Sequence, residues 1–358
     1  MKIDQIPAEV LNTIRKGTVI PAHPLALTAD RKLDVAHQRA LTRYYIDSGA
    51  GGIAIGVHST QFEIRDPNVG LFEPVLRLAS ETIDRWCKAR GRAVLKIAGV
   101  CGKTEQAVRE AGFARENGFH ACLVSLGALP TESLPALVGH CRQVAAVMPV
   151  IGFYLQPGVG GRILPYRFWR EFADISNVLA IKIAPFNRYQ TLDVVRAVCE
   201  AGREADVTLY TGNDDNIVVD LLTEYRVQTP RSEKKVRIRG GLLGHWAVWT
   251  RKAVEQLEEI IKLRADNAPI PAGMLTLAAE ITDANAAFFD AAHQFAGCIP
   301  GIHEVLRRQG LMQGAWCLNP AERLSPGQPE EIDRVYASYP HLNDDDFVRA
   351  HLDEWLEE

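Results

Sequence analysis

Short runs of hydrophobic and β-branched residues recur along the first two thirds of the chain, and a longer amphipathic stretch follows each run. In residues 105–117, apolar positions recur at helical spacing, and the stretch ends at Asn117-Gly118, a common helix stop. From the third run onward, the runs begin about every 28 to 30 residues, which fits one strand, one helix and their loops. The predicted strands are residues 18–22, 52–57, 93–98, 121–125, 150–155, 178–183, 207–211 and 236–243.

Eight strands that alternate with helices over about 260 residues favour an α/β fold of the (β/α)8 TIM-barrel type. A doubly wound open sheet of the same length remains possible on this pattern. From residue 271 onward the pattern is helical, and we predict a C-terminal helical appendage with helices at 276–295, 303–309, 330–337 and 344–356. We therefore divide the chain into an N-terminal helical extension (1–16), the barrel (17–265) and a C-terminal helical region (266–358). The polar segment 229–235 is interpreted as a surface insertion before the last strand.

The composition is that of an ordinary globular protein, and it narrows the range of partners. Hydrophobic residues make up 47% of the 358 positions and charged residues 23%, which excludes wholesale disorder. A formal charge of −4 argues against general binding to nucleic acid or to an anionic membrane. The N-terminal residues contain no apolar signal segment, and no run approaches 18 apolar residues. The seven cysteines form no C-x-x-C pair, so we expect reduced thiols in a cytoplasmic protein.

Two lysines interrupt hydrophobic strands, Lys182 in the sixth predicted strand and Lys96 in the third. An ammonium group inside a barrel is unfavourable unless it is paired, so its pKa should fall. A neutral amine is a nucleophile suited to Schiff-base formation with a carbonyl compound. A salt-bridged lysine, or one that points outward between helices, fits the same pattern. The pattern decides neither between these alternatives nor between the two lysines.

Five stretches occur in an order and spacing that match one known family. Residues 150–158 read Val-Ile-Gly-Phe-Tyr-Leu-Gln-Pro-Gly, and Ala180-Ile181-Lys182 follows about 25 residues later. The other matching stretches are 51–56, 97–107 and 210–214. Over roughly residues 17–310, these motifs resemble the dihydrodipicolinate synthase and N-acetylneuraminate lyase family of class I aldolases.

The resemblance implies that Lys182 forms the Schiff base and that Tyr154 relays protons to and from the intermediates. It also implies a carboxylate-binding loop after the second strand. The expected substrate-binding residues are His58, Ser59, Thr60 and Leu243. Neither a cofactor nor a metal is implied, because the iminium itself withdraws electrons. The family resemblance further implies a homo-oligomer, a dimer or a tetramer, with a small 2-oxo acid as the substrate.

The chain also departs from the family pattern. The glutamate that usually ends the carboxylate-binding loop is absent, although Ser59 and Thr60 could still hold a carboxylate. The tyrosine that the synthases carry after strand four is missing from residues 124–130. The arginine after the strand-five proline is displaced to Arg162. These departures indicate that the chain is not a typical dihydrodipicolinate synthase.

Three other features have simpler interpretations. Gly99 and Gly102 precede Lys103-Thr104, but a P-loop needs four residues between its glycines and this loop has two, which argues against nucleotide binding. The residues 213–215, Asn-Asp-Asp, are expected to cap the following helix rather than to bind a metal. His23 and His245 lie near strand ends, where each could line the pocket or be structural.

We therefore predict a Schiff-base-forming aldolase or lyase that acts on pyruvate or a related 2-oxo acid. A dehydratase of a sugar-derived 2-oxo acid, which uses the same imine, is an alternative. A catalytically silent barrel that binds a small molecule is another.

Overall fold

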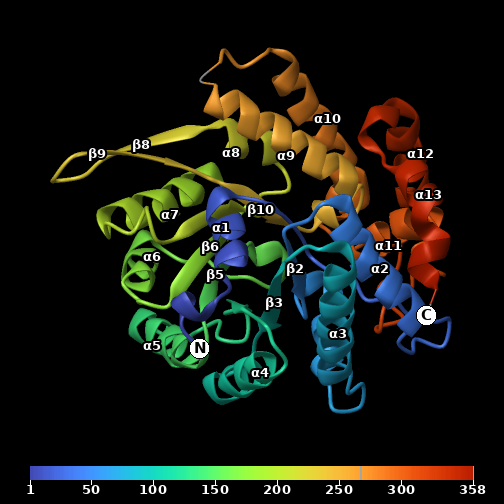
Figure 1. Cartoon of the computed structure of the whole chain (residues 1–358), viewed down its shortest axis with the longest axis horizontal. Coiled ribbons are helices and arrows are strands. Elements are labelled where there is room, and N and C mark those ends of the chain that lie inside the picture. The colour runs from blue at the N-terminus through green and yellow to red at the C-terminus, as the bar shows by residue number, and fades with distance from the viewer. Residues whose placement is uncertain (267, 358) are drawn as a thin grey trace. The chain divides into compact units, whose positions relative to one another are not determined.

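The computed structural model describes residues 1–266 and 268–357, and the chain folds as a (β/α)8 barrel with further helices at its C-terminus (Figure 1). This confirms the predicted fold class over the open sheet. The eight parallel strands fall in the eight predicted runs, with ends that differ by up to four residues. They are β1 (Val19–Pro21), β2 (Gly52–Ile55), β3 (Leu95–Val100), β4 (Ala121–Val124), β5 (Val150–Leu155), β6 (Val178–Ala184), β7 (Thr208–Thr211) and β10 (Gly240–Leu243).

The chain forms two compact units. The first contains residues 1–18 and 95–242, and the second contains residues 19–94 together with the chain from residue 243 onward. Each unit contains strands of the barrel, so these units differ from the division at residue 265 that the hydropathy pattern suggested.

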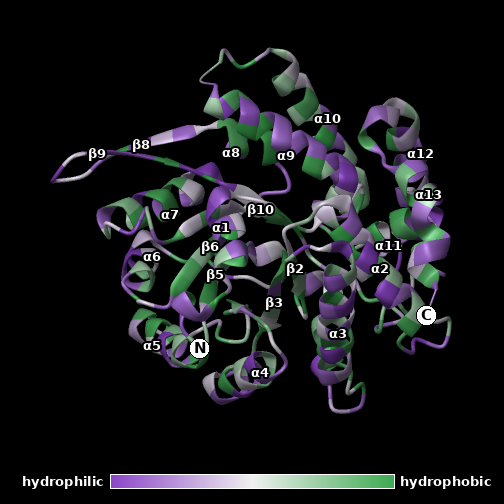
Figure 2. Cartoon of the chain, viewed as in Figure 1, coloured by the Kyte–Doolittle hydropathy of each residue, from purple (hydrophilic) through white to green (hydrophobic). Residues whose placement is uncertain are grey.

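In the first unit the strands are hydrogen-bonded in the order β10-β7-β6-β5-β4-β3. Figure 2 shows β5 and β6 as hydrophobic strands, as expected for parallel strands that are covered on both faces. In the register of these strands, Lys182 pairs with Phe153 of β5 and with Tyr210 of β7. The helices of this unit are α1 (Ala8–Lys16), α4 (Thr104–Glu116), α5 (Leu134–Val147), α6 (Tyr166–Ala173), α7 (Arg188–Glu200) and α8 (Ile217–Leu222).

The segment 229–235, expected as a surface insertion before the last strand, forms the turn and part of the second strand of an antiparallel hairpin. Its strands are β8 (Glu224–Gln228) and β9 (Glu233–Arg237), and Figure 1 shows the hairpin extending outward past α7. The predicted strand 236–243 was therefore too long, because its first two residues pair with β8. The physical reason is the charge pattern of β9, which reads Glu-Lys-Lys-Val-Arg and suits an exposed ribbon rather than a barrel wall.

In the second unit, β1 and β2 are neighbours, and the His23 amide donates to the Ala54 carbonyl at 2.8 Å. The C-terminal region is helical, as predicted. Asp344 anchors it as a buried carboxylate that accepts hydrogen bonds from the Tyr44 hydroxyl, the Arg251 amide and the Gln309 side chain. The helices of this unit are α2 (Val35–Ser48), α3 (Phe72–Arg90), α9 (Thr250–Ala265), α10 (Gly273–Phe288), α11 (Cys298–Arg308), α12 (Gln328–Ser338) and α13 (Asp345–Leu356).

Within the described part of the chain, no helix is both long enough and apolar enough to cross a membrane. Among the same residues, no group of histidine, cysteine and carboxylate side chains has the arrangement of a metal site. All seven cysteines are free thiols.

Candidate active site

Lys182 is a buried lysine near the carboxyl end of β6. It is the fifth of seven strand residues and 7% exposed, and its Nζ lies 4.4 Å from the centre of the Phe153 ring. Burial lowers the pKa of Lys182 from 10.5 to about 8, although the negative charge of Asp214 opposes this shift. At pH 7 an amine with such a pKa is neutral about a tenth of the time, far more often than an exposed lysine. Lys182 therefore meets the physical requirement for a nucleophilic amine.

Gly212, just after β7, leaves the space in which the Lys182 side chain lies. A Cβ atom at Gly212 would come within 2.7 Å of Lys182 Cε and within 2.7 Å of Ala184 Cβ. Because atoms cannot approach so closely, any side chain here would displace the lysine or the end of β6.

Lys96 lies at the other end of its strand. It is the second of six residues in β3, and both its amide and its carbonyl are hydrogen-bonded to His120, at 3.0 and 2.9 Å. Function in (β/α)8 barrels resides at the carboxyl ends of the strands. The position of Lys182 thus favours it over Lys96, a choice that the sequence pattern left open.

The structure does not bring Tyr154 to the lysine amine. Successive strand residues point to opposite faces, and Phe153, not Tyr154, is in register with Lys182. The Tyr154 ring packs against Trp169 of α6 at 5.3 Å, and its hydroxyl accepts a hydrogen bond from the Leu164 amide at 3.2 Å. The Phe153 ring therefore lies beside the Lys182 amine, the Tyr154 hydroxyl is bonded to the Leu164 amide, and the relay role of Tyr154 stays a prediction.

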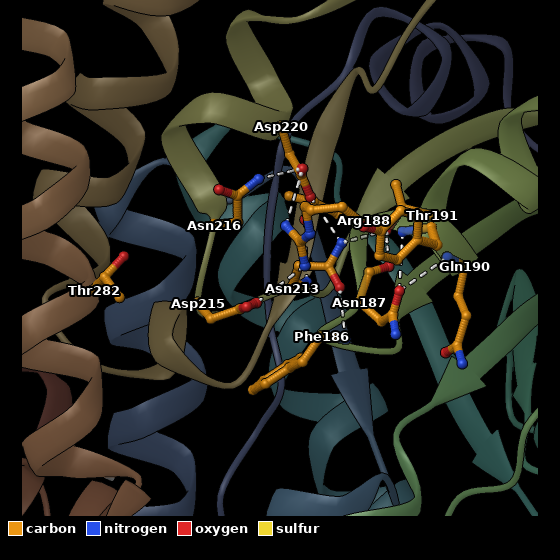
Figure 3. Close-up of polar contacts among 12 residues, drawn as sticks. Phe186, Asn187, Arg188, Gln190, Thr191, Asn213, Asp215, Asn216, Asp220 and Thr282 are labelled. Carbon is orange, nitrogen blue, oxygen red and sulfur yellow. Dashed lines mark hydrogen bonds and ion pairs between the residues drawn. The ribbon is translucent and has the colours of Figure 1, made fainter.

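The β7–α8 loop, which begins at Gly212, is held by a buried network of polar side chains (Figure 3). Asn213 donates through its amide to Asp220 at 2.8 Å and to Thr191 at 3.2 Å, and its oxygen accepts from the Phe186 amide at 3.0 Å. Asp220 is 1% exposed and also accepts from the Thr211 hydroxyl at 2.7 Å. These bonds fix the loops after β6 and β7 to each other.

The same loop corrects the expected cap at residues 213–215. Helix α8 begins at Ile217 with Asn216 at its N-cap position, and no side chain there makes a capping hydrogen bond. Asp215 instead forms an ion pair with Arg188 at 3.3 Å, and Arg188 also reaches Asp220 at 3.4 Å. Asn213 and Asp215 therefore connect the loops after β6 and β7 and do not cap α8.

The expected carboxylate-binding loop lies in the second unit, where its hydroxyl groups already have acceptors. Ser59 donates to the Ala22 carbonyl at 2.8 Å, and Thr60 donates to the His23 carbonyl at 2.7 Å. The Thr60 oxygen in turn accepts from the Gly56 amide at 2.9 Å. A hydroxyl has one proton to donate, so neither side chain can donate to a carboxylate in this arrangement. Both hydroxyls tie the loop to the end of β1.

Three further candidate residues of this unit, His58, Leu243 and His23, differ in how deeply they are buried. His58 is partly exposed, with its ring 6.0 Å from that of Phe62. Leu243 is fully buried, and its carbonyl accepts from the Ala22 amide, so it is a packed strand residue. Burial lowers the pKa of His23 to about 4, and its ring nitrogens lie 2.8 Å from the Pro24 carbonyl and 2.9 Å from the Thr42 hydroxyl. His23 is thus a neutral structural histidine.

Two of the family departures noted in the sequence, at Arg162 and in the loop after β4, fall in the first unit. Arg162 donates to the carbonyls of Leu129 and Glu132, in the loop after β4, and so is used to hold that loop. A Cβ atom at Gly127 would lie 2.5 Å from the Gly160 carbonyl oxygen. The loops after β4 and β5 therefore pack too closely for a tyrosine at Gly127.

No family model matches the chain. The chain is 25% identical to the 4-hydroxy-tetrahydrodipicolinate synthase of Moorella thermoacetica over 211 residues, which is 58% of this chain. The match spans 66% of that protein, slightly less than two thirds of its length.

Two solved structures are similar over nearly their whole length. YagE, a prophage protein of the dihydrodipicolinic acid synthase family from E. coli K12, solved in complex with pyruvate, is 19% identical with a TM-score of 0.67. The match covers 90% of this chain and 97% of YagE. The chloride-inhibited dihydrodipicolinate synthase of Acinetobacter baumannii, also complexed with pyruvate, is 16% identical with a TM-score of 0.71, over 90% and 99% of the two chains. These structures share the fold of the chain, and the sequence match shows its similarity to a 4-hydroxy-tetrahydrodipicolinate synthase.

Proposed function

We propose that the protein is a lyase of the class I aldolase kind, which binds pyruvate or a related 2-oxo acid as a Schiff base on Lys182. The observation that carries this proposal is a buried lysine near the carboxyl end of β6, with its pKa lowered to about 8. The pyruvate complexes of the YagE and Acinetobacter proteins support the choice of substrate class.

The first step is attack of the neutral Lys182 amine on the keto carbon of the 2-oxo acid. The carbinolamine then loses water to give an iminium ion, whose positive charge makes the adjacent carbon acidic. Loss of a proton from that carbon gives an enamine, the nucleophile in condensation and the product of cleavage. The buried setting of Lys182 keeps water from competing with these steps.

Borohydride trapping tests the nucleophile. Incubation with pyruvate and borohydride should add a permanent three-carbon group to the peptide that contains Lys182, as read by mass spectrometry. Lys182→Ala should remove the label with little loss of fold, whereas Lys96→Ala should keep it. A label on Lys96 would overturn the assignment.

A second candidate function is a silent barrel that binds a small molecule. The observation that favours it is the phenyl ring of Phe153 beside the amine, where a hydroxyl was expected. Exchange of the pyruvate methyl protons for deuterium in D2O separates the two candidates. An aldolase exchanges these protons through the enamine, even when the aldehyde partner is unknown, and a silent barrel leaves them in place.

The sequence resemblance also suggests a dehydratase of sugar-derived 2-oxo acids and a homo-oligomer, and both stay proposals. A panel of 2-oxo acids scored by imine trapping checks the first. Sedimentation velocity checks the second.

A further inference from the structure

A hollow of about 90 Å³ lies at the amino ends of β7 and β10, in the first unit. Arg15, Arg237 and Arg239 line it together with the carboxylate of Glu204. Lys182 lies near the carboxyl end of β6, and β6, β7 and β10 run parallel to one another. The hollow is therefore at the opposite edge of the sheet from the candidate active site.

The fold brings the arginines of this hollow together from separate segments. Arg15 lies in the last turn of α1, and the helix ends at Gly17. A Cβ atom at Gly17 would lie 2.1 Å from the Arg239 carbonyl oxygen, so the end of α1 is in direct contact with the segment before β10. Arg237 ends β9, and the fully buried Ile238 separates it from Arg239. Packing of α1 and of residue 238 thus holds the three arginines around one hollow.

Positive charge exceeds negative charge at the hollow, in a chain whose formal charge is −4. Glu204 forms an ion pair with Lys234 of β9 at 2.6 Å, which offsets its charge. Arg237 donates to Glu224 at 3.2 Å and to a backbone carbonyl at 3.0 Å, and these bonds use two of its five N–H donors. Arg15 is exposed, and it makes no ion pair with any residue that the structure describes. Cationic donors therefore remain for a ligand.

We propose that this hollow binds a phosphate group, either as inorganic phosphate or as the phosphoryl end of a small phosphate monoester. The planar guanidinium group matches the oxygens of a phosphate and binds them through charge-assisted hydrogen bonds. The size also fits, because a single buried water needs a cavity of about 10–15 Å³, and this hollow has room for a group of four oxygens. The inference goes beyond the proposed function and does not depend on Lys182.

The position of the hollow indicates a ligand that is bound and not converted. Chemistry in (β/α)8 barrels takes place at the carboxyl ends of the strands, whereas this hollow lies at the amino ends. A phosphate between Arg15 and Arg239 would connect α1 to the segment before β10. Because a ligand that binds only the folded chain stabilises it, phosphate should raise the Tm of the protein.

Titration calorimetry with inorganic phosphate tests the site, in a buffer of physiological ionic strength that screens general attraction to exposed charges. The proteins compared are wild type, Arg15→Gln, Arg239→Gln and the control Arg231→Gln, which removes the same charge from the exposed turn of the hairpin. We expect Arg15→Gln and Arg239→Gln each to weaken phosphate binding by about 10- to 150-fold, the range for hydrogen bonds to a charged group. Arg231→Gln should stay within about twofold of wild type. The rise in Tm with phosphate should follow the same order.

Two further variants and a second ligand sharpen the test. Glu204→Gln should tighten phosphate binding, because it removes the carboxylate that lines the hollow. Lys182→Ala should bind phosphate as wild type does. Glycerol phosphate distinguishes the two sources of the phosphate group: tighter binding than that of inorganic phosphate identifies a monoester, and equal or weaker binding identifies the free ion.

The inference is overturned if wild type gives no heat of binding at millimolar phosphate, or if Arg231→Gln weakens binding as much as Arg15→Gln does. Loss of phosphate binding in Lys182→Ala would also overturn it, because phosphate would then occupy the candidate active site. If circular dichroism shows that one of the two arginine variants does not fold, the other decides, since Arg15 and Arg239 lie on separate segments.

Discussion

Gly212 is the residue through which a single methyl group should disturb the lysine. Gly212→Ala places a Cβ atom 2.7 Å from both Lys182 Cε and Ala184 Cβ. Overpacking of this kind costs about 1–3 kcal/mol, so we expect the trapping rate with pyruvate to fall by about 5- to 160-fold. Gly139→Ala is the control, since nothing lies within 4 Å of a Cβ atom at that helical position. Trapping at the wild-type rate in Gly212→Ala would show that the Lys182 side chain reaches pyruvate in another conformation.

Tyr154→Phe separates a structural hydroxyl from a proton relay. The change removes the acceptor of the buried Leu164 amide, so the free energy of unfolding in urea should fall by about 1–3 kcal/mol. Because the hydroxyl lies on the α6 side of β5, exchange of the pyruvate methyl protons should stay within about threefold of wild type. Tyr189→Phe, at a tyrosine that is 83% exposed, should change neither quantity. A loss of exchange by 10²-fold or more in Tyr154→Phe, in the range typical of acid–base groups, would restore the relay role.

At the scale of the elements, hydropathy was sufficient to locate the strands but not to orient every side chain. A one-residue difference in register exchanges the two faces of a strand, and the sequence Phe153-Tyr154 offers an aromatic ring for either face. The motif after β5 identified the tyrosine by its distance from Pro157, whereas the direction of its side chain depends on the pairing of β5 with β6. The hydropathy pattern does not predict the hairpin, because β9 carries four charged residues among its five and so does not resemble a buried strand.

The β8–β9 hairpin should be dispensable for the chemistry. Replacing residues 226–235 with Asn-Gly keeps the Tyr225–Val236 pair as the closing pair of a two-residue turn. The change removes the ion pair between Lys234 and Glu204, and pairs of this kind contribute roughly 0–1 kcal/mol. We expect unchanged imine trapping and a loss of less than about 1 kcal/mol in the free energy of unfolding. Loss of the label on Lys182 would show instead that the hairpin supports the site through α7.

At the scale of the whole molecule, local and non-local features differ in how well a sequence reveals them. Lys182 is noticeable because a charge stands in an apolar run, a local signal that Lys96 shares. The hydroxyls of Ser59 and Thr60 were assigned to the substrate, but they donate to carbonyls 37 residues away, at the end of β1. The local sequence around Ser59 and Thr60 does not predict such hydrogen bonds, because the acceptors belong to a distant segment of the chain.

The reaction should be independent of divalent metal ions. An iminium on Lys182 withdraws electrons as a Lewis-acidic metal would, so EDTA should leave both trapping and pyruvate exchange unchanged. The expected result is equal rates before and after dialysis against the chelator. Loss of all activity in EDTA, restored by a divalent ion, would contradict the Schiff-base mechanism.

Condensation of pyruvate with aspartate semialdehyde should be weak or absent. That second substrate carries a carboxylate and an amine, and in the synthases an arginine after strand five and a tyrosine after strand four organise its end of the pocket. Here Arg162 donates to the carbonyls of Leu129 and Glu132, and the loop after β4 has no tyrosine, since a Cβ atom at Gly127 would already lie 2.5 Å from the Gly160 carbonyl oxygen. Each polar group of the substrate left without a partner costs about 1–3 kcal/mol. Summed over several groups, this raises the activation barrier enough to lower the rate constant by several orders of magnitude. A coupled assay with both compounds should therefore give a rate far below that of pyruvate exchange in the same sample. Efficient condensation would keep the imine mechanism and show that other residues of the chain hold the second substrate.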